Sequence, residues 1–174
     1  MQFKRCIGLT SVALSAGILL SGTAAADYYS YVYTPKGNSV SVFVMTSEFS
    51  QKEIAASDAK TKRTYPRASL VGSTSRKYNC HSYAWYNNSS NNNVWMNDPT
   101  RYRTDGSYIG YCSVKPNAFD KVYYPSNTPD NSHSAISLGG GQARSKWGQG
   151  PLMSHPINYG PKIYQMSCYN SYRR

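Results

Sequence analysis

Acidic residues are scarce in this sequence: 8 Asp and Glu stand against 19 Lys and Arg, which gives a formal net charge of +11 at pH 7. A basic excess of this size fits an anionic partner, and for a secreted protein the candidates are wall polymers, membrane surfaces or released nucleic acid. The charge is equally explained by simple solubility. Among these partners we expect an anionic cell-wall polymer and no specific recognition of nucleic acid.

The short motifs that bind metal ions or phosphate groups are missing. There is no Cys-x-x-Cys and no His-Glu-x-x-His, and the adjacent Cys80 and His81 cannot easily face one ion from a regular helix. Three glycines at 139–141 follow a predicted strand, but no helical pattern comes after them, as a phosphate cradle would require. We therefore expect no metal and no other cofactor.

No apolar run is long enough to make a good membrane span. The run at 7–22 follows two basic residues and precedes an Ala-x-Ala site that ends at Ala26, which is the pattern of a secretory signal peptide over residues 1–26. The mature chain, residues 27–174, then has the length of a single domain. We expect a monomer that is secreted, extracellular or periplasmic, with no transmembrane segment.

Phenylalanine and tryptophan are also few, with 4 and 3 copies, whereas tyrosine occurs 17 times. Rigid amphipathic rings suit a surface that packs on sugars or on other rings. Trp85, Trp95 and Trp147 could form a platform for a sugar, but core packing is the more frequent fate of tryptophan in a short strand or helix. The aromatic composition therefore does not identify a ligand.

Three cysteines remain after the signal peptide: Cys80, Cys112 and Cys168. In an exported protein two of them can pair and the third is left over. Cys112 and Cys168 lie in irregular, Tyr-rich segments, and a bond between them would tie the tail to the body, so we predict this disulfide. Cys80 is then the odd thiol, although the sequence leaves open its pairing with either of the others.

The pattern of side chains predicts an α+β chain. Apolar residues at 28–34 and 39–46 flank a Pro-Lys-Gly-Asn turn, which predicts a β-hairpin. Ser50 and Glu53 have the spacing of a capping box and predict a helix to about Lys62. The remaining elements that we expect are strands at 121–124, 133–138 and 143–147, a short buried helix near 78–86, and a loop over 94–112.

Cys80 stands at the start of the predicted short helix, in the stretch YNCHSYAW. The dipole and the free backbone N–H groups of a first helical turn favour thiolate over thiol and can hold an oxyanion. Tyr78 and Asn79 could add a side-chain donor. His81 is expected to pack beside the site, because neighbouring side chains on a helix point about 100° apart. His133, on a predicted strand, could accept the thiol proton.

Three motifs together resemble the papain-like cysteine hydrolases of bacterial cell walls, of the NlpC and CHAP type. They are YNCHSYAW, the strand entry from Asp120 to Tyr124, and HSAI at 133–136. With SKWG at 145–148, the set is also similar to uncharacterised secreted bacterial proteins that share CHSYAW, HSAI and SKWG. The chain departs from the hydrolase pattern at Asn79, where Asp is usual, and at Phe119, where Gly is usual.

The resemblance implies a papain-like α+β fold, with a small antiparallel sheet packed against the helix that bears the cysteine. It implies Cys80 as nucleophile and His133 as general base in the cleavage of an amide bond, in peptidoglycan or a peptide. The third polar group of the family falls on the strand after the histidine, which offers Ser145 and the nearby Gln149. His155 is chemically better suited, and we place it first.

Two other functions stay open. One is a non-catalytic secreted binding module or effector in which Cys80 forms a disulfide. The other is an acyl or peptide transferase, because the acyl-enzyme is common to hydrolysis and transfer. Arg144 and Lys146 are expected on a solvated strand face.

Overall fold

The computed structural model describes residues 26–127 and 131–174. The predicted signal peptide lies outside the described residues, apart from Ala26. Within the described part of the chain, no helix combines the length and the apolar character that crossing a membrane requires.

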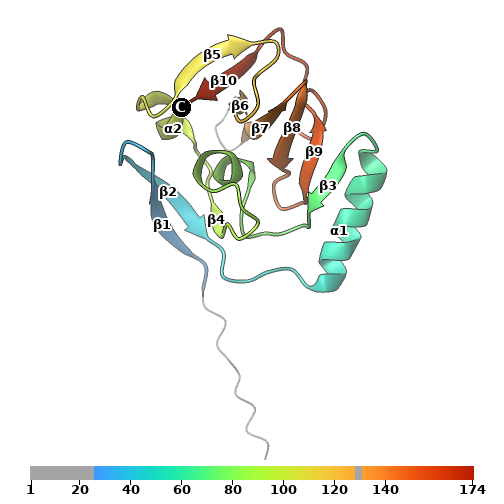
Figure 1. Cartoon of the computed structure of the whole chain (residues 1–174). Helices are drawn as coiled ribbons and strands as arrows, with labels where there is room; N and C mark the ends of the chain where they lie inside the picture. The colour runs from blue at the N-terminus through green and yellow to red at the C-terminus, as the bar shows by residue number, and fades with distance from the viewer. Residues whose placement is uncertain (1–25, 128–130) are drawn as a thin grey trace, which may run out of the picture.

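The described chain is α+β, as the sequence predicts, with two antiparallel sheets and few helices (Figure 1). The smaller sheet has the order β1-β2-β4 and consists of β1 (Tyr28–Tyr33), β2 (Ser39–Val44) and β4 (Val94–Trp95). The larger sheet has the order β3-β9-β8-β7-β6-β10-β5. Its strands are β3 (Ser69–Gly72), β5 (Ile109–Ser113), β6 (Lys121–Tyr124), β7 (His133–Gly139), β8 (Gln142–Lys146), β9 (Leu152–Pro156) and β10 (Tyr169–Arg173).

Strands β1 and β2 form the predicted hairpin, with Tyr28 opposite Val44 and Tyr33 opposite Ser39. Their valines point into the core, while Tyr29 on the other face contacts the ring of Phe43 edge-on at 5.1 Å between centroids. This alternation of buried and exposed side chains explains why the sequence alone predicted the hairpin.

The predicted helix after the hairpin is α1 (Gln51–Thr64), and its capping box is present. The Ser50 backbone N–H donates to the Glu53 carboxylate at 2.8 Å, and the Glu53 N–H donates to the Ser50 hydroxyl at 3.3 Å. In Figure 1 this helix lies at the edge of the molecule, beyond β3. The other helices are the one-turn π-helix η1 (Ser82–Tyr86) and α2 (Thr100–Thr104).

The register of the large sheet divides its central side chains between two faces, because alternate residues of a strand point to opposite sides. The helix face, which η1 covers, carries Tyr123, Ser134, Ile136, Arg144, Lys146 and Leu152. The tail face, which residues 157–169 cover, carries Tyr124, His133, Ala135, Ala143, Ser145 and His155. Each face has its own buried apolar cluster.

The prediction of a loop over 94–112 is wrong. The segment contains β4, α2 and the edge strand β5, and Tyr102 of α2 is buried with its hydroxyl donating to the Tyr33 carbonyl at 3.1 Å. Strands β3, β9 and β10 were also not expected. Each is short and mixes polar with apolar residues, so its strand character depends on partners that are distant in the sequence.

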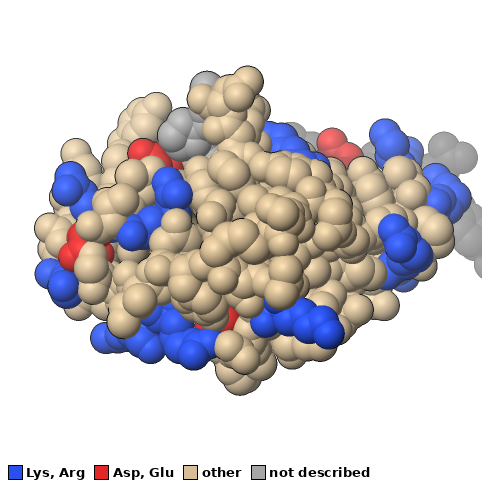
Figure 2. All heavy atoms as spheres, turned by 90° about the horizontal axis from the view of Figure 1, so that it is seen from above, with Lys and Arg blue, Asp and Glu red and all other residues tan. Residues whose placement is uncertain are grey.

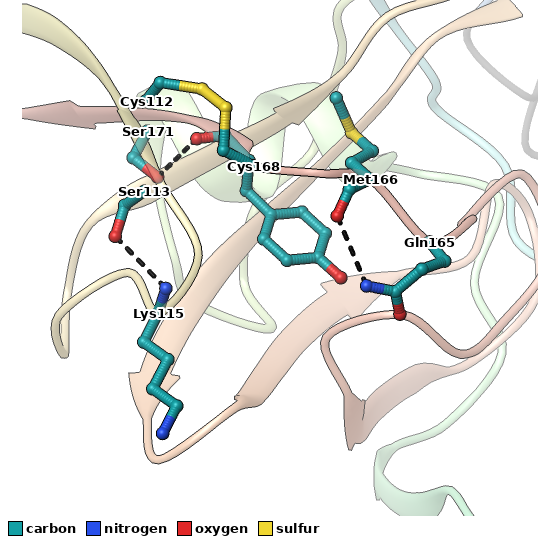
Figure 3. Close-up of a disulfide and its surroundings, with 8 residues drawn as sticks. Cys112, Ser113, Lys115, Gln165, Met166, Cys168 and Ser171 are labelled. Carbon is teal, nitrogen blue, oxygen red and sulfur yellow. Dashed lines mark hydrogen bonds between the residues drawn. A yellow bond between two sulfur atoms is a disulfide. The ribbon is translucent and has the colours of Figure 1, made fainter.

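The predicted disulfide between Cys112 and Cys168 is present, with a Cα–Cα distance of 5.6 Å (Figure 3). It links β5 to the residue before β10, and these two strands pair from Tyr169 opposite Ser113 onward. The disulfide therefore holds the C-terminal strand in the large sheet.

Candidate active site

Cys80 is a free, buried cysteine. The turn that carries it is fixed by Asn79, whose side-chain oxygen accepts from the Ser82 N–H at 3.1 Å while the Asn79 N–H donates to the Ser82 hydroxyl at 3.2 Å. The Asn79 amide also donates to the Met96 carbonyl at 2.7 Å. This bond engages one of the two amide N–H groups, and the expectation that Asn79 offers a side-chain donor to a substrate stays a prediction.

Cys80 and His133 line the same cavity, which has a volume of about 340 Å³. The cavity lies where β7 begins and β8 ends, so side chains from both faces of the large sheet reach it. Its walls include the indole rings of Trp95 and Trp147, and Lys162 lines it as well. The sequence had suggested the two tryptophans only as part of a sugar platform, and Lys162 had not been expected at the site.

Two backbone N–H groups, those of Ser134 and His81, hydrogen-bond to the Cys80 sulfur and lower its pKa. Burial has the larger effect and raises the pKa of the thiol to about 11. The expectation that the start of a helix makes this thiol acidic is therefore wrong, because the effect of burial outweighs that of the two N–H donors. At pH 7 Cys80 is a neutral thiol.

His133 is 3% exposed and its ring lies 5.8 Å from that of Tyr124, centroid to centroid. Its Nε2 atom is buried and has no hydrogen-bond partner among the described residues. Burial, together with the charges of His155, His81 and Lys162, holds the pKa of His133 well below its usual range. His133 is therefore a neutral imidazole with a ring nitrogen that is not already occupied.

His81 lines the cavity, and its ring is bound on both sides. Its Nδ1 lies 2.8 Å from the Ser134 hydroxyl and its Nε2 lies 3.3 Å from the Ser132 hydroxyl. Trp85 donates its indole N–H to the same Ser134 oxygen at 2.8 Å. Because an indole N–H can only donate, the Ser134 oxygen accepts from Trp85 and its O–H can donate to His81 Nδ1. His81 therefore lines the cavity with both ring nitrogens engaged, and its role beside the site stays a prediction.

His155 lies on β9 and does not line the cavity. Its Nδ1 donates to the Pro156 carbonyl at 2.8 Å, and its Nε2 lies 2.8 Å from the Ser145 hydroxyl, which accepts from the indole N–H of Trp147 at 3.0 Å. Burial lowers the pKa of His155 to about 4. Both ring nitrogens are engaged, and no hydrogen bond joins this ring to His133, which is also described.

The structure thus brings together four of the predicted site residues, Asn79, Cys80, His81 and His133, around one cavity. Three others do not line it. Ser145 and His155 lie behind Trp147 on the tail face, and Tyr78 packs at 2% exposure against Tyr83. Gln149 lies beside a different surface hollow, next to α1.

The expected position of Lys146 on a solvated strand face is wrong. Its side chain is fully buried, and Nζ donates to the carbonyls of Ser75 and Gly148, each at 2.7 Å. Arg144, on the same face two residues earlier, is half-buried and donates to Ser154. No local signal in the sequence distinguishes these two cations.

No group of three or more His, Cys, Asp or Glu side chains within residues 26–127 and 131–174 is arranged to hold a metal ion. The chemistry that the cavity offers is a thiol, an imidazole and backbone N–H donors. These are the groups used in acyl transfer to sulfur.

Comparison of the chain with protein-family models, with curated proteins and with solved structures found no match.

Proposed function

We propose that this protein is a secreted, papain-like cysteine hydrolase that cleaves an amide bond in peptidoglycan or in a peptide. The observation that carries the proposal is the shared cavity of Cys80 and His133. It contains a thiol that forms no disulfide and a buried imidazole nitrogen with no hydrogen-bond partner. A buried polar atom without a partner is costly, so its presence beside a thiol favours a role in proton transfer.

In the proposed reaction, the Cys80 sulfur attacks the carbonyl carbon of the amide and the thiol proton passes to His133. His133 then gives this proton to the departing amine, and water hydrolyses the thioester. The N–H groups of Ser134 and His81 stabilise the negative charge on sulfur. Because burial keeps both partners neutral at rest, the reactive ion pair forms only as the proton moves.

The backbone before Asp120 also favours the resemblance to the NlpC and CHAP hydrolases. Phe119 stands where those enzymes have glycine, and its φ of 72° lies in the left-handed region that favours glycine. The packing of η1 on one face of an antiparallel sheet likewise suits a papain-like arrangement.

Secretion and attraction to an anionic wall polymer belong to the same proposal. A disulfide persists in oxidising compartments, which suits an extracellular or periplasmic protein. Figure 2 shows Lys and Arg side chains around the periphery of the face in view, with few Asp or Glu among them. A surface of this kind attracts polyanions.

The Cys80 disulfide expected for a non-catalytic binding module or effector is not present, because Cys80 is free and Cys112 pairs with Cys168. A binding module with a free Cys80 would release no product in the test. Transfer of the acyl group to an amine instead of water uses the same cavity and the same first step. We therefore treat transfer as an outcome of the test.

The test is to incubate the purified mature protein with peptidoglycan and to analyse the products by mass spectrometry. We expect new amines and fragments from the parent protein and none from Cys80→Ser, which retains the size of the side chain. Addition of a free amine at high concentration separates the two reactions, since a transferase would form a new amide with it.

The folded double variant Cys112→Ser/Cys168→Ser serves as a control, because it removes the disulfide and leaves Cys80 and the cavity in place. Equal release by the parent and by Cys80→Ser would exclude Cys80 from the mechanism.

A further inference from the structure

Lys146 is a buried cation beside the cavity. Its Nζ donates to two carbonyls, those of Ser75 and Gly148, and lies 4.8 Å from the centre of the Tyr78 ring. An ammonium group has three N–H donors, and the two carbonyls and the ring face account for all of them. These contacts suit a protonated side chain that is held in one position.

No ion pair joins Lys146 to a carboxylate in the described part of the chain. Glu48 and Asp58 act on it from a distance, but both bind the segment at 74–76 instead. Burial of an ammonium without a counter-ion is costly. Burial accordingly lowers the pKa of Lys146 to about 7.

The nearby group that can become an anion is the Cys80 thiol. Arg144 pairs with Ile136, so Lys146 and Ser134, each two residues away from that pair, lie on the same face of the sheet. The Ser134 N–H hydrogen-bonds to the Cys80 sulfur. Gly148, whose carbonyl holds the ammonium, lines the cavity. The positive charge of Lys146 favours the thiolate of Cys80, and the thiolate favours the ammonium in return.

We propose that Lys146 is a positioning residue whose fixed, buried ammonium stabilises the Cys80 thiolate from behind the cavity. The inference rests on the proposed role of Cys80 as the nucleophile. When the S–H bond breaks, the proton passes to His133 and the negative charge stays on sulfur, while Lys146 keeps its own proton. The carbonyls of Ser75 and Gly148 prevent the ammonium from turning away from the sulfur.

Lys162 provides an internal comparison. It also lowers the pKa of Cys80, but it lies exposed at the rim of the cavity. Salt screens an exposed charge much more than a buried one. The contribution of Lys146 should therefore persist at high ionic strength, and that of Lys162 should not.

The test follows alkylation of Cys80 by iodoacetamide in the mature chain, by mass spectrometry, from about pH 6 to about pH 10. We expect Lys146→Met and Lys146→Gln to slow alkylation at least about tenfold near pH 6, where Lys146 keeps its proton, since one pKa unit is a factor of ten in thiolate. Lys162→Gln should also slow alkylation at low salt, but its effect should disappear in about 1 M salt, whereas that of the Lys146 variants should persist. Lys115→Gln, an exposed lysine near the disulfide in Figure 3, is the matched control for net charge and should react at the parent rate.

A folded neutral variant at position 146 that alkylates at the parent rate would overturn the proposal. Failure of both neutral variants to fold would overturn it as well, because Lys146 would then be structural. Alkylation needs no amide substrate, so the two proposals can fail separately. If the Lys146 variants slow alkylation but the parent protein cleaves no amide, the proposed hydrolase activity fails and the role of Lys146 remains. If amide cleavage requires Cys80 but not Lys146, the role of Lys146 fails and the hydrolase activity remains.

Discussion

Two hydrogen-bonded networks of the same composition lie on opposite faces of the large sheet. The helix-face network joins Trp85, Ser134 and His81, and the tail-face network joins Trp147, Ser145 and His155. In each, an indole N–H occupies a serine oxygen, so the serine hydroxyl can donate to a ring nitrogen of the histidine. On the tail face the Pro156 carbonyl can only accept, so His155 carries its proton on Nδ1.

His133 differs from both, because its buried Nε2 atom has no partner among the described residues. The two bound histidines illustrate how this fold satisfies an imidazole when packing is the purpose. The contrast is consistent with the proposed role of His133 as the base for the Cys80 thiol, which lines the same cavity.

The largest expected effect concerns His133, the histidine that differs from the two hydrogen-bonded ones. His133→Gln should lower amide cleavage by a factor of about 100 or more, the usual contribution of a general base. His155→Gln should change cleavage by only a few-fold, since His155 lies outside the cavity. The measurement is the initial rate of amine release at equal concentrations of folded protein. The reverse ranking would make His155 the base and contradict the assignment.

The second effect concerns the pH dependence of stability. Burial lowers the pKa of His155 to about 4 in the folded state, whereas an exposed histidine titrates near 6.5. Between these values the unfolded chain binds a proton that the folded chain does not, so stability falls as the pH drops through this window. The shift corresponds to roughly 3 kcal/mol.

Urea unfolding near pH 7 and near pH 4, with the parent and with His155→Gln, measures this contribution. Carboxylates protonate in both proteins, so the difference between the two pH dependences isolates His155. Parallel curves for the two proteins would show that the tail-face network tolerates a charged histidine.

Local patterns predicted much of the fold. The hairpin, the capped helix, strand β6 and the two strands around the glycine joint each carry their signal in adjacent residues. The disulfide was predicted because only three cysteines follow the signal peptide, which leaves few possible pairs. For the site, the sequence indicated Cys80 and His133, and the structure places both at one cavity.

The rest could not be predicted because it depends on packing between distant segments. Arg144 and Lys146 share a strand and a face, yet only Lys146 meets the carbonyls at 75 and 148 that bury it. The pKa of Cys80 likewise depends on how completely the protein covers the turn. A helix start alone does not determine whether its thiol is acidic.

The smallest expected effect sharpens the comparison between the two networks. Ser134→Ala and Ser145→Ala each remove a fully buried hydroxyl and leave an indole N–H without its acceptor. Each should lower the free energy of unfolding by about 2 kcal/mol, measured by urea denaturation near pH 7. Only Ser134→Ala should also alter the alkylation of Cys80, because His81 lines the cavity and His155 does not.

The double variant Ser134→Ala/Ser145→Ala serves as the control. The two hydroxyls point to opposite faces of the sheet and share no hydrogen-bond partner among those described, so their effects should add to within about 0.5 kcal/mol. A larger coupling energy would mean that β7 and β8 transmit the loss of one network to the other. In that case His155 would influence the cavity through the sheet, and its separation from the site would no longer hold.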